Sequence, residues 1–464
     1  MRRGWTATRT ALVAGTCTAV LVGGGVSALA LRGGDLPVLA RPTPSPSPSL
    51  LPLLPAPSAH APVPTAAGLR RALAPGLTDR SLGGSVAISV LDAVTGKPLL
   101  ETDSREVVLP ASTAKIATAV AALTALPPDR RLTTKVVAGA APGEVVLVGG
   151  GDPSLGGRLT KASTYPPVAR ISDLAAQVRT ALAGAPVTRV TVDDSLYAGP
   201  LLGPGWRPQY VTGGDVAPVM ALMVDGGRIR PSPSRAPRLA DPALAAGHQL
   251  AALLGVPKAV VVRGRAAAGA KELGSVASPT VQQLVEGMLT RSDNDLAEAL
   301  SRQVAIAKGE PATFSGAAAA VRGVLRDVLS QVGEAPGAVS LQDGSGLSRL
   351  DRVQPGALTR LLSAIAGRDR DRLYPVLSGL PVAGFDGTLE KRFRRGPGLP
   401  AAGVVRAKTG TLNGVSALAG LVRTRDGRLL AFDLTADSVP IGSTLASQTA
   451  LDRLAAALAG CGCR

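Results

Sequence analysis

The clearest β-strand patterns of this 464-residue chain lie near its two ends, and this placement limits how the chain can fold. Near the start, residues 85–90 and 98–102 read as two strands joined by the turn Val94-Thr95-Gly96-Lys97. Near the end, three more strand patterns occur at 404–411, 416–423 and 429–435. One antiparallel sheet built from both chain ends, with helices on its faces, is the economical arrangement. The predicted class is α/β (α+β).

Helix patterns occupy much of the remaining chain. Apolar residues recur at helical spacing in the segments 67–74, 112–126, 171–182, 242–254, 280–290, 313–332, 355–365, 373–377 and 447–458. From about 133 to 275 the texture changes, because short valine-rich strand patterns alternate with loops rich in glycine and proline. These strand patterns lie at 145–148, 187–192 and 259–262. We interpret residues 133–275 as one or two inserted subdomains that interrupt a main domain formed by 66–132 and 276–464.

The first 65 residues predict export. Arg2 and Arg3 precede an apolar stretch over about 11–31, which is typical of a leader, with a candidate cleavage site at Ala28-Leu29-Ala30. The apolar run approaches the length that spans a bilayer, so an uncleaved leader would anchor the protein in the membrane. Residues 32–65 are rich in proline and serine and predict an extended linker. We expect the folded body to lie at the extracytoplasmic face of the membrane or in the cell wall.

Composition excludes several kinds of site. Histidine occurs only at His60 and His248, whereas a Ser-His-Asp triad needs a placed imidazole and a hydrolytic zinc site usually needs two or more. A hydrolase of this composition therefore needs another base, and we expect neither a metal nor an organic cofactor. The formal net charge is +17, but no basic patch is visible, so nucleic-acid binding is not expected.

Cysteine provides no disulfide framework. Cys17 lies in the predicted leader, and Cys461 and Cys463 close the chain around a single glycine. A bridge between these two or a pair of free thiols are both compatible with the sequence.

A serine and a lysine three residues apart form the first candidate site. Ser112 and Lys115 follow Pro110 at the start of a predicted helix, so both side chains lie on one helix face. A serine hydroxyl is a weak nucleophile until a base takes its proton, and a lysine can be that base when burial or nearby positive charge lowers its pKa. Alone, the pattern is also compatible with an ordinary helix start and a surface lysine.

Two further short patterns follow in order along the chain. They are Ser292-Asp293-Asn294 and Lys408-Thr409-Gly410, and each has an ordinary explanation as a turn or as a strand end. Their occurrence in this order, after Ser112-x-x-Lys115, is much more specific than any one of them. The set is typical of class A β-lactamases and penicillin-binding proteins.

The resemblance narrows to one family when more of the chain is considered. The motifs, together with Ala297-Glu298, Asp343-Gly344-Ser345-Gly346-Leu347-Ser348, Gly387-Thr388-Leu389 and Thr411, resemble the D-alanyl-D-alanine carboxypeptidase/endopeptidase family. These are the class C low-molecular-mass penicillin-binding proteins, which carry inserted domains between the motifs, unlike class A β-lactamases. The segment 149–155 also resembles part of the family's insertion, and the similarity covers about 66–460. One departure is Asp351, where the family pattern suggests a polar, Asn-like residue.

The resemblance implies a role for each motif residue. Ser112 would attack a peptide carbonyl and Lys115 would take its proton, while Ser292 would relay a proton to the leaving amine. Asn294 would hold Lys115 and the substrate amide. Lys408 would add positive charge that favours a neutral Lys115 and attracts a substrate carboxylate. The strand with Thr409, Gly410 and Thr411 would bind the substrate backbone, and the N–H groups of Ser112 and Thr411 would form the oxyanion hole.

The expected protein is therefore an exported serine DD-peptidase that acts on peptidoglycan stem peptides. It would hydrolyse D-Ala-D-Ala ends, D-Ala-meso-diaminopimelate cross-links, or both, and β-lactam antibiotics would acylate Ser112. Two alternatives remain open from the sequence. One is a β-lactamase-like hydrolase or esterase on the same scaffold, and the other is a catalytically silent protein that binds the cell wall.

Overall fold

The computed structural model describes residues 60–84, 86–161, 164–231, 236–335, 337–367 and 370–463. The predicted leader over 1–31 and all but the last residues of the predicted linker over 32–65 lie outside the described residues. Within the described part of the chain, no helix is both long and apolar enough to cross a membrane.

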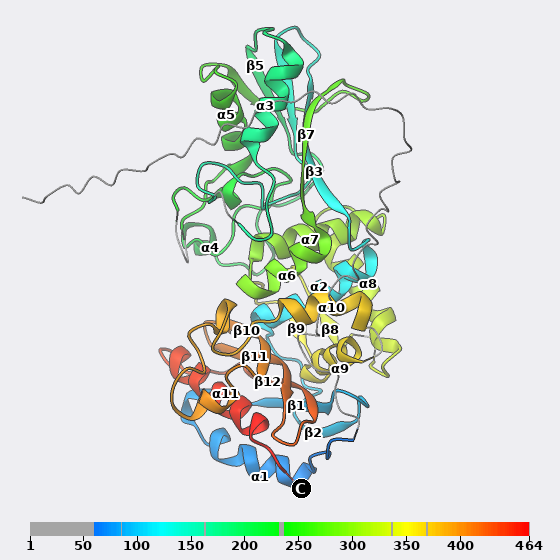
Figure 1. Ribbon diagram of the computed structural model, residues 1–464, viewed down its shortest axis with the longest axis vertical. Coiled ribbons are helices and arrows are strands. Elements are labelled where there is room, and N and C mark those ends of the chain that lie inside the picture. The colour runs from blue at the N-terminus through cyan, green and yellow to red at the C-terminus, as the bar shows by residue number, and fades with distance from the viewer. Residues whose placement is uncertain are drawn as a thin grey trace, which may run out of the picture. The chain divides into compact units, whose positions relative to one another are not determined.

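The main sheet joins the two ends of the described chain, as predicted. Its five strands are antiparallel neighbours in the order β10-β11-β12-β1-β2, and Figure 1 shows the N-terminal strands beside the orange strands of the C-terminal part. Their bounds are β1 Ala87–Asp92, β2 Pro98–Thr102, β10 Val405–Leu412, β11 Val415–Arg423 and β12 Leu429–Ala436.

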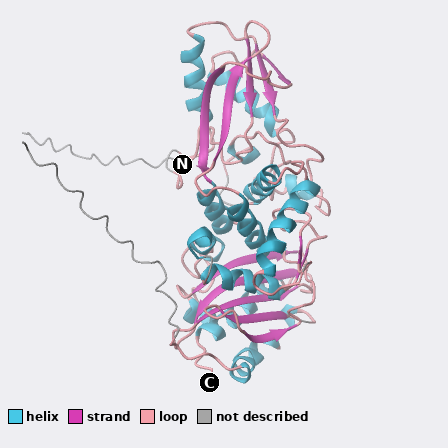
Figure 2. Ribbon diagram, turned by 90° about the vertical axis from the view of Figure 1, so that its right-hand side faces the viewer, coloured by secondary structure: helices cyan, strands magenta, loops and turns pink. Residues whose placement is uncertain are grey.

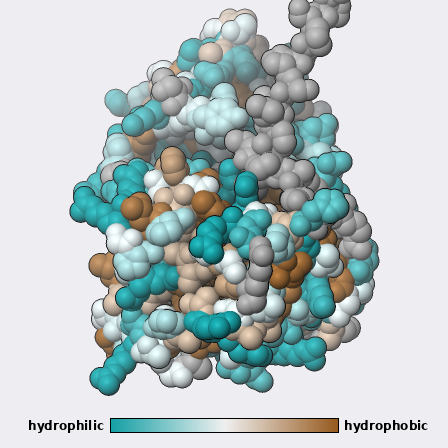
Figure 3. All heavy atoms as spheres, turned by 60° about the horizontal axis from the view of Figure 1, so that its bottom comes forward, coloured by the Kyte–Doolittle hydropathy of each residue, from teal (hydrophilic) through white to brown (hydrophobic). Residues whose placement is uncertain are grey.

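Both faces of this sheet are buried. Successive side chains point to opposite sides of a strand, so each strand contributes to two cores. Leu418, Val422 and Phe432 belong to a core shared with helices α1 (Ala66–Leu77) and α11 (Thr444–Ala459). Residues between them, such as Leu421 and Ala431, belong to a second core with the central helices. Figure 2 shows helices on both faces of the strands. On the surface at the end that carries α1, hydrophobic residues lie interspersed with hydrophilic ones (Figure 3).

The second core contains a layer of central helices built around α2 (Ala114–Ala125). Alanine dominates α2, so its neighbours can approach closely, and almost all of the helix is buried. The other helices of this layer are α6 Val281–Arg291, α7 Asn294–Ala307, α8 Phe314–Ser330, α9 Pro355–Ala366 and α10 Arg370–Gly379. Helix α7 was not predicted as a helix, because its buried face includes charged residues that interrupt the apolar period.

A second five-stranded sheet lies between α2 and α6 in the sequence. Its order is β6-β5-β4-β3-β7, with β4-β5 and β5-β6 parallel and the other pairs antiparallel, and it has its own apolar core. The long strands β3 and β7 were not predicted, because their buried positions include polar residues such as Thr134 and Ser278, which interrupt the apolar pattern. The bounds are β3 Arg131–Ala138, β4 Glu144–Val148, β5 Arg189–Asp193, β6 Val260–Arg263 and β7 Glu272–Thr280, with helices α3 Ile171–Leu182 and α5 Pro242–Leu253.

Shorter elements connect these layers. They are the 3-10 turns η1 Arg80–Leu82, η2 Ala111–Thr113, η3 Asp225–Gly227, η4 Gly387–Leu389 and η5 Gly396–Ala401, the helix α4 Gln209–Thr212, and the strands β8 Val339–Ser340 and β9 Arg352–Val353. At the C-terminal end, Cys461 and Cys463 form a disulfide, one of the two states that the sequence left open. The N–H of Thr65 donates to the carbonyl of Cys463 at 2.7 Å. This hydrogen bond holds the N-terminal end of α1 next to the disulfide segment.

A buried ion pair between the ends of β1 and β12 gives a test of the fold. The Arg428 guanidinium donates to both carboxylate oxygens of Asp92, and both side chains are almost fully buried. Although burial opposes it, this pairing holds the pKa of Asp92 below its usual range. The stabilisation is therefore present above the ordinary carboxyl pKa and is lost as the pH falls through the lowered value.

We expect Asp92→Asn to lower the free energy of unfolding by about 3 kcal/mol, because the carboxylate charge that compensates the buried Arg428 would be lost. Urea unfolding at pH 7 measures this difference, and the exposed Asp129→Asn is the control for loss of one carboxylate. Equal stability of Asp92→Asn and the control would contradict the assignment.

Candidate active site

The predicted serine and lysine are in direct contact. Ser112 lies in the turn η2, immediately before α2, and Lys115 lies in the first turn of that helix. The preceding residue, Ala111, has the left-handed φ of 48°, which bends the chain into the helix just before Ser112. Lys115 Nζ is 3.0 Å from Ser112 Oγ, and the lysine is fully buried. The side chains are therefore close enough for direct proton transfer between them.

Lys115 has three hydrogen-bond acceptors. Besides Ser112 Oγ, its Nζ donates to Asn294 Oδ1 and to the backbone carbonyl of Ser345, each at 2.6 Å. Asn294 begins α7, and its Nδ2 donates to the carbonyl of Asp215 at 2.8 Å, which fixes the orientation of the amide. An ammonium group has three N–H donors, so the contacts around Lys115 match the charged form.

The second lysine, Lys408, is in contact with the second serine. Lys408 lies on β10 and is fully buried, and its Nζ donates to Ser292 Oγ at 2.8 Å and to the carbonyl of Thr409 at 3.0 Å. Ser292 ends α6 with a left-handed φ of 56°, the conformation that separates α6 from α7. Only two acceptors therefore face Lys408 among the residues that the structure describes, one fewer than face Lys115.

Burial lowers the pKa of both lysines, but nearby carboxyl groups oppose this effect only at Lys115. Burial lowers the pKa of Lys115 to about 8, although Asp343, Glu298, Asp293 and Asp351 act in the opposite direction. Burial lowers the pKa of Lys408 well below its ordinary value, and the charge on Lys115 lowers it further. Burial thus favours the neutral form of both lysines, and the charge on Lys115 opposes a second charge on Lys408. The predicted role of Lys408, a positive charge that favours a neutral Lys115, stays a prediction.

The strand with the third motif lies against the turn with Ser112. A Cβ atom on Gly410 would come within 2.7 Å of the Pro110 carbonyl and 3.3 Å of Ala111 Cβ, so only glycine permits this approach. Thr409 Oγ1 donates to Thr388 Oγ1 at 2.9 Å. Thr411 is exposed and accepts a hydrogen bond from Gln448 at 3.0 Å. The eight predicted site residues thus lie on the segments that meet around the two lysines.

The turn over 343–348 supplies a group that the sequence analysis missed. It contributes the Ser345 carbonyl that binds Lys115, and its Gly344 and Ser345 N–H groups donate to the buried Glu298. A backbone carbonyl carries no sequence signal. The family resemblance included Glu298 without a role for it; this residue lies four positions after Asn294, on the same face of α7.

Asp351, the departure from the family pattern, is fully buried and accepts a hydrogen bond from the Gln342 N–H at 2.6 Å. Burial and the neighbouring Asp343 raise the pKa of Asp351 well above its ordinary value. These surroundings favour the neutral form of the carboxyl, which is closer in charge to the amide that the family pattern suggests.

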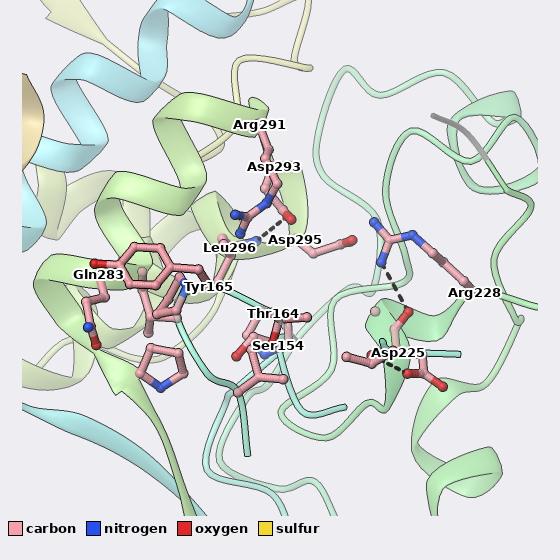
Figure 4. Close-up of a pocket in the computed structure, with 17 residues that line it drawn as sticks. Ser154, Thr164, Tyr165, Asp225, Arg228, Gln283, Arg291, Asp293, Asp295 and Leu296 are labelled. Atoms are coloured by element: carbon pink, nitrogen blue, oxygen red, sulfur yellow. Dashed lines mark hydrogen bonds between the residues drawn. The ribbon is translucent and has the colours of Figure 1, made fainter. Parts of the chain in front are cut away.

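A cavity of about 390 Å³ lies against the other side of the Ser292 turn. Figure 4 shows Tyr165 and Gln283 on one side of it and Arg228 and Asp225 on the other. The carboxylate oxygens of Asp225 accept hydrogen bonds from Gly157, Leu159 and Thr160. The exposed Arg291 also lines this cavity, so the cavity is lined by two arginines, Arg228 and Arg291.

Comparison with known proteins identifies the family. The chain matches the D-Ala-D-Ala carboxypeptidase 3 (S13) family over residues 69–238 and 233–458, and it belongs to that family. It is 41% identical over 465 residues to Carboxypeptidase DacB of Mycolicibacterium smegmatis, covering 98% of each chain. It is 40% identical over 441 residues to Carboxypeptidase Rv3627c of Mycobacterium tuberculosis, covering 93% of this chain and 92% of the relative.

The fold agrees with this assignment. Penicillin binding protein 4 of Haemophilus influenzae superposes with a TM-score of 0.67 at 22% identity, covering 84% of this chain and 97% of that chain. The predicted fold, the resemblance to class C penicillin-binding proteins and the prediction of a serine-type D-Ala-D-Ala carboxypeptidase are confirmed.

The close approach at Gly410 can be tested by adding one methyl group. Gly410→Ala should push β10 away from the Ser112 turn and lower the rate of acylation by a labelled penicillin at least tenfold, about 1.4 kcal/mol or more in the barrier. Gly323→Ala on α8 is the matched control, because nothing lies within 4 Å of its added Cβ. Equal acylation rates in the two variants would show that the approach is not required.

Proposed function

We propose that the protein is an exported serine DD-peptidase that forms an acyl ester on Ser112. Its substrates would be peptidoglycan stem peptides, cut at the terminal D-Ala-D-Ala bond, at D-Ala-meso-diaminopimelate cross-links, or at both. The observation that carries the proposal is the 3.0 Å contact between Lys115 Nζ and Ser112 Oγ. Family membership supports the substrate class.

In the first step, neutral Lys115 accepts the Ser112 proton while Oγ attacks the carbonyl carbon between the two D-alanines. The negative oxygen of the tetrahedral intermediate would receive hydrogen bonds from the N–H groups of Ser112 and Thr411. When the C–N bond breaks, the departing amine needs one proton. Ser292 Oγ, which contacts Lys408 Nζ, can give its hydroxyl proton to the amine and regain a proton from the lysine pair, which leaves Lys115 neutral and Lys408 charged. Water then hydrolyses the ester by the reverse path, with Lys115 again as the base, and restores the Ser112 hydroxyl.

Substrate binding provides a reason for Lys115 to become neutral. The carboxylate at the end of a D-Ala-D-Ala peptide would supply Lys408 with a third acceptor and a compensating charge, so Lys408 becomes protonated. Two adjacent buried ammonium groups repel each other, and Lys115 then gives up its proton. The base is thus activated when a peptide with a free carboxylate occupies the site. Asn294 would remain bound to Lys115 through Oδ1 throughout.

The same proposal covers where the protein is located and how its chain is divided into domains. Residues 1–31 would export the protein, as a cleaved leader or a retained membrane anchor, and 32–65 would act as a spacer. Residues 66–132 and 276–464 would form the catalytic domain, and 133–275 the insertion. The separate core of the second sheet supports this division. Penicillins would acylate Ser112 because they present a reactive carbonyl and a carboxylate like the peptide.

Purified protein should form a covalent adduct with a labelled penicillin and release D-alanine from a D-Ala-D-Ala peptide. Ser112→Ala should abolish both, because the attacking oxygen is lost, and Lys115→Ala should block acylation in a protein that still unfolds cooperatively. The exposed Ser315→Ala is the control. Intact mass spectrometry detects the adduct. Absence of both adduct and D-alanine release in the wild type would reject the proposal.

The pH dependence of acylation follows from the shared proton. The active form carries one proton on the lysine pair, located on Lys408, so the second-order rate constant should be bell-shaped in pH. Because the pKa of Lys115 is lowered to about 8, the rate should fall above about pH 8, as the last proton leaves the pair. Stopped-flow measurement with a chromogenic penicillin tests this expectation. A rate that rises steadily to pH 10 would contradict it.

A further inference from the structure

One buried carboxylate is linked to Lys115 through a single peptide residue. Glu298 accepts hydrogen bonds from the N–H of Gly344, at 3.1 and 3.2 Å to its two oxygens, and from the N–H of Ser345, at 2.9 Å. The carbonyl of that same Ser345 accepts the hydrogen bond from Lys115 Nζ at 2.6 Å. The position of the Glu298 carboxylate therefore determines where the third acceptor of Lys115 lies. Thr118 holds the neighbouring Gly344 carbonyl at 2.7 Å.

The partner of Glu298 is an arginine with unusual surroundings. Arg302 is fully buried one helical turn further along α7, and its Nη1 lies 3.6 Å from Glu298 Oε2. None of its three nitrogens makes a hydrogen bond within the described part of the chain. Its guanidinium carbon instead lies 4.1 Å from the centre of the Phe314 ring and 5.6 Å from that of Tyr197.

A buried guanidinium without hydrogen bonds is costly, and its ion pair with Glu298 at 3.6 Å offsets that cost only in part. Apolar packing therefore does not explain the arginine at position 302. What arginine provides, and an apolar residue does not, is a fixed positive charge beside Glu298.

We propose that Glu298 is a positioning residue for the catalytic lysine, acting through the Gly344–Ser345 backbone, and that Arg302 keeps its carboxylate ionised and in place. The inference rests on the proposed role of Lys115 as the base. Glu298 would have two effects. Its oxygens hold the Ser345 carbonyl against Lys115, and its negative charge stabilises the protonated lysine until substrate arrives.

The charged groups around the two residues allow these effects to be separated. Lys115 is influenced by the carboxyl groups of Asp343, Glu298, Asp293 and Asp351, besides the facing Lys408. Burial, together with the charge on Asp343, raises the pKa of Glu298 to about 7, although Arg302 acts in the opposite direction. Glu298 is thus mostly ionised at pH 8. Without Arg302 its pKa would rise and the carboxyl would become neutral there.

The test compares penicillin acylation across pH in the full-length protein and its variants. Glu298→Gln keeps an acceptor for the turn but removes the charge, so Lys115 loses a stabilising partner. The alkaline limb of the bell should move to lower pH by roughly half a unit or more, with the maximal rate within about threefold of wild type. Arg302→Met should move the limb in the same direction, because Glu298 becomes neutral, whereas Arg302→Lys should leave it in place.

Two further variants make the test specific. The double variant Glu298→Gln/Arg302→Met should have the profile of Glu298→Gln alone, because Arg302 acts through Glu298. Glu298→Ala removes the acceptor as well, and its acylation rate should fall more than tenfold while the dissociation constant of the initial penicillin complex changes little. The exposed Glu310→Gln is the control for loss of one charge on the protein.

Thermal unfolding is measured for every variant. If Glu298→Ala or Arg302→Met fails to fold, the pH profiles of Glu298→Gln and Arg302→Lys decide the test. An unchanged pH profile in Glu298→Gln, or shifts that add in the double variant, would overturn the inference while leaving the proposed function intact. A wild-type protein that forms no penicillin adduct would instead refute the proposed function and, with it, this inference.

Discussion

The structure depends on the burial of two lysine amino groups at one place. Lys115 and Lys408 are both fully buried, and a charge in such a position is tolerated only where polar groups surround it. The acceptors come from distant parts of the chain, namely the Ser112 turn, the break between α6 and α7, the turn at 343–348 and the strand β10. Helices and sheet must therefore be packed in register for either lysine to be satisfied.

The acceptors are distributed unequally, and this inequality gives the site its chemistry. Three oxygens surround Lys115 and several carboxyl groups favour its charge, whereas two oxygens face Lys408. We propose that the free protein keeps the proton on Lys115, the lysine that must later act as a base. A ligand carboxylate at Lys408 reverses this preference, so the same group that identifies a peptide end also prepares the nucleophile. In our proposal, Glu298 and Arg302 stabilise the protonated form of Lys115 before substrate binds.

Much of this arrangement could be predicted from the sequence. The sheet from both chain ends followed from strand patterns whose alternation is strong, and the paired serines and lysines followed from the order of three short motifs. Helix α7 and strands β3 and β7 were missed for a physical reason. The buried positions of α7 include charged residues, such as Glu298 beside Arg302, and those of β3 and β7 include polar residues such as Thr134 and Ser278, so the apolar period is broken. The Ser345 carbonyl was missed because backbone groups are the same in every residue.

The central claim is that a single proton is shared by the two lysines and moves when the site is occupied. Nuclear magnetic resonance of protein labelled with ¹³C at the lysine Cε, with signals assigned through Lys115→Arg and Lys408→Arg, measures each titration directly. The account predicts that in the free protein Lys408 loses its proton at a lower pH than Lys115, and that after acylation by penicillin Lys408 stays charged while Lys115 is neutral at pH 8. Two lysines that both titrate near 10.4, the ordinary value, with no response to penicillin would contradict it.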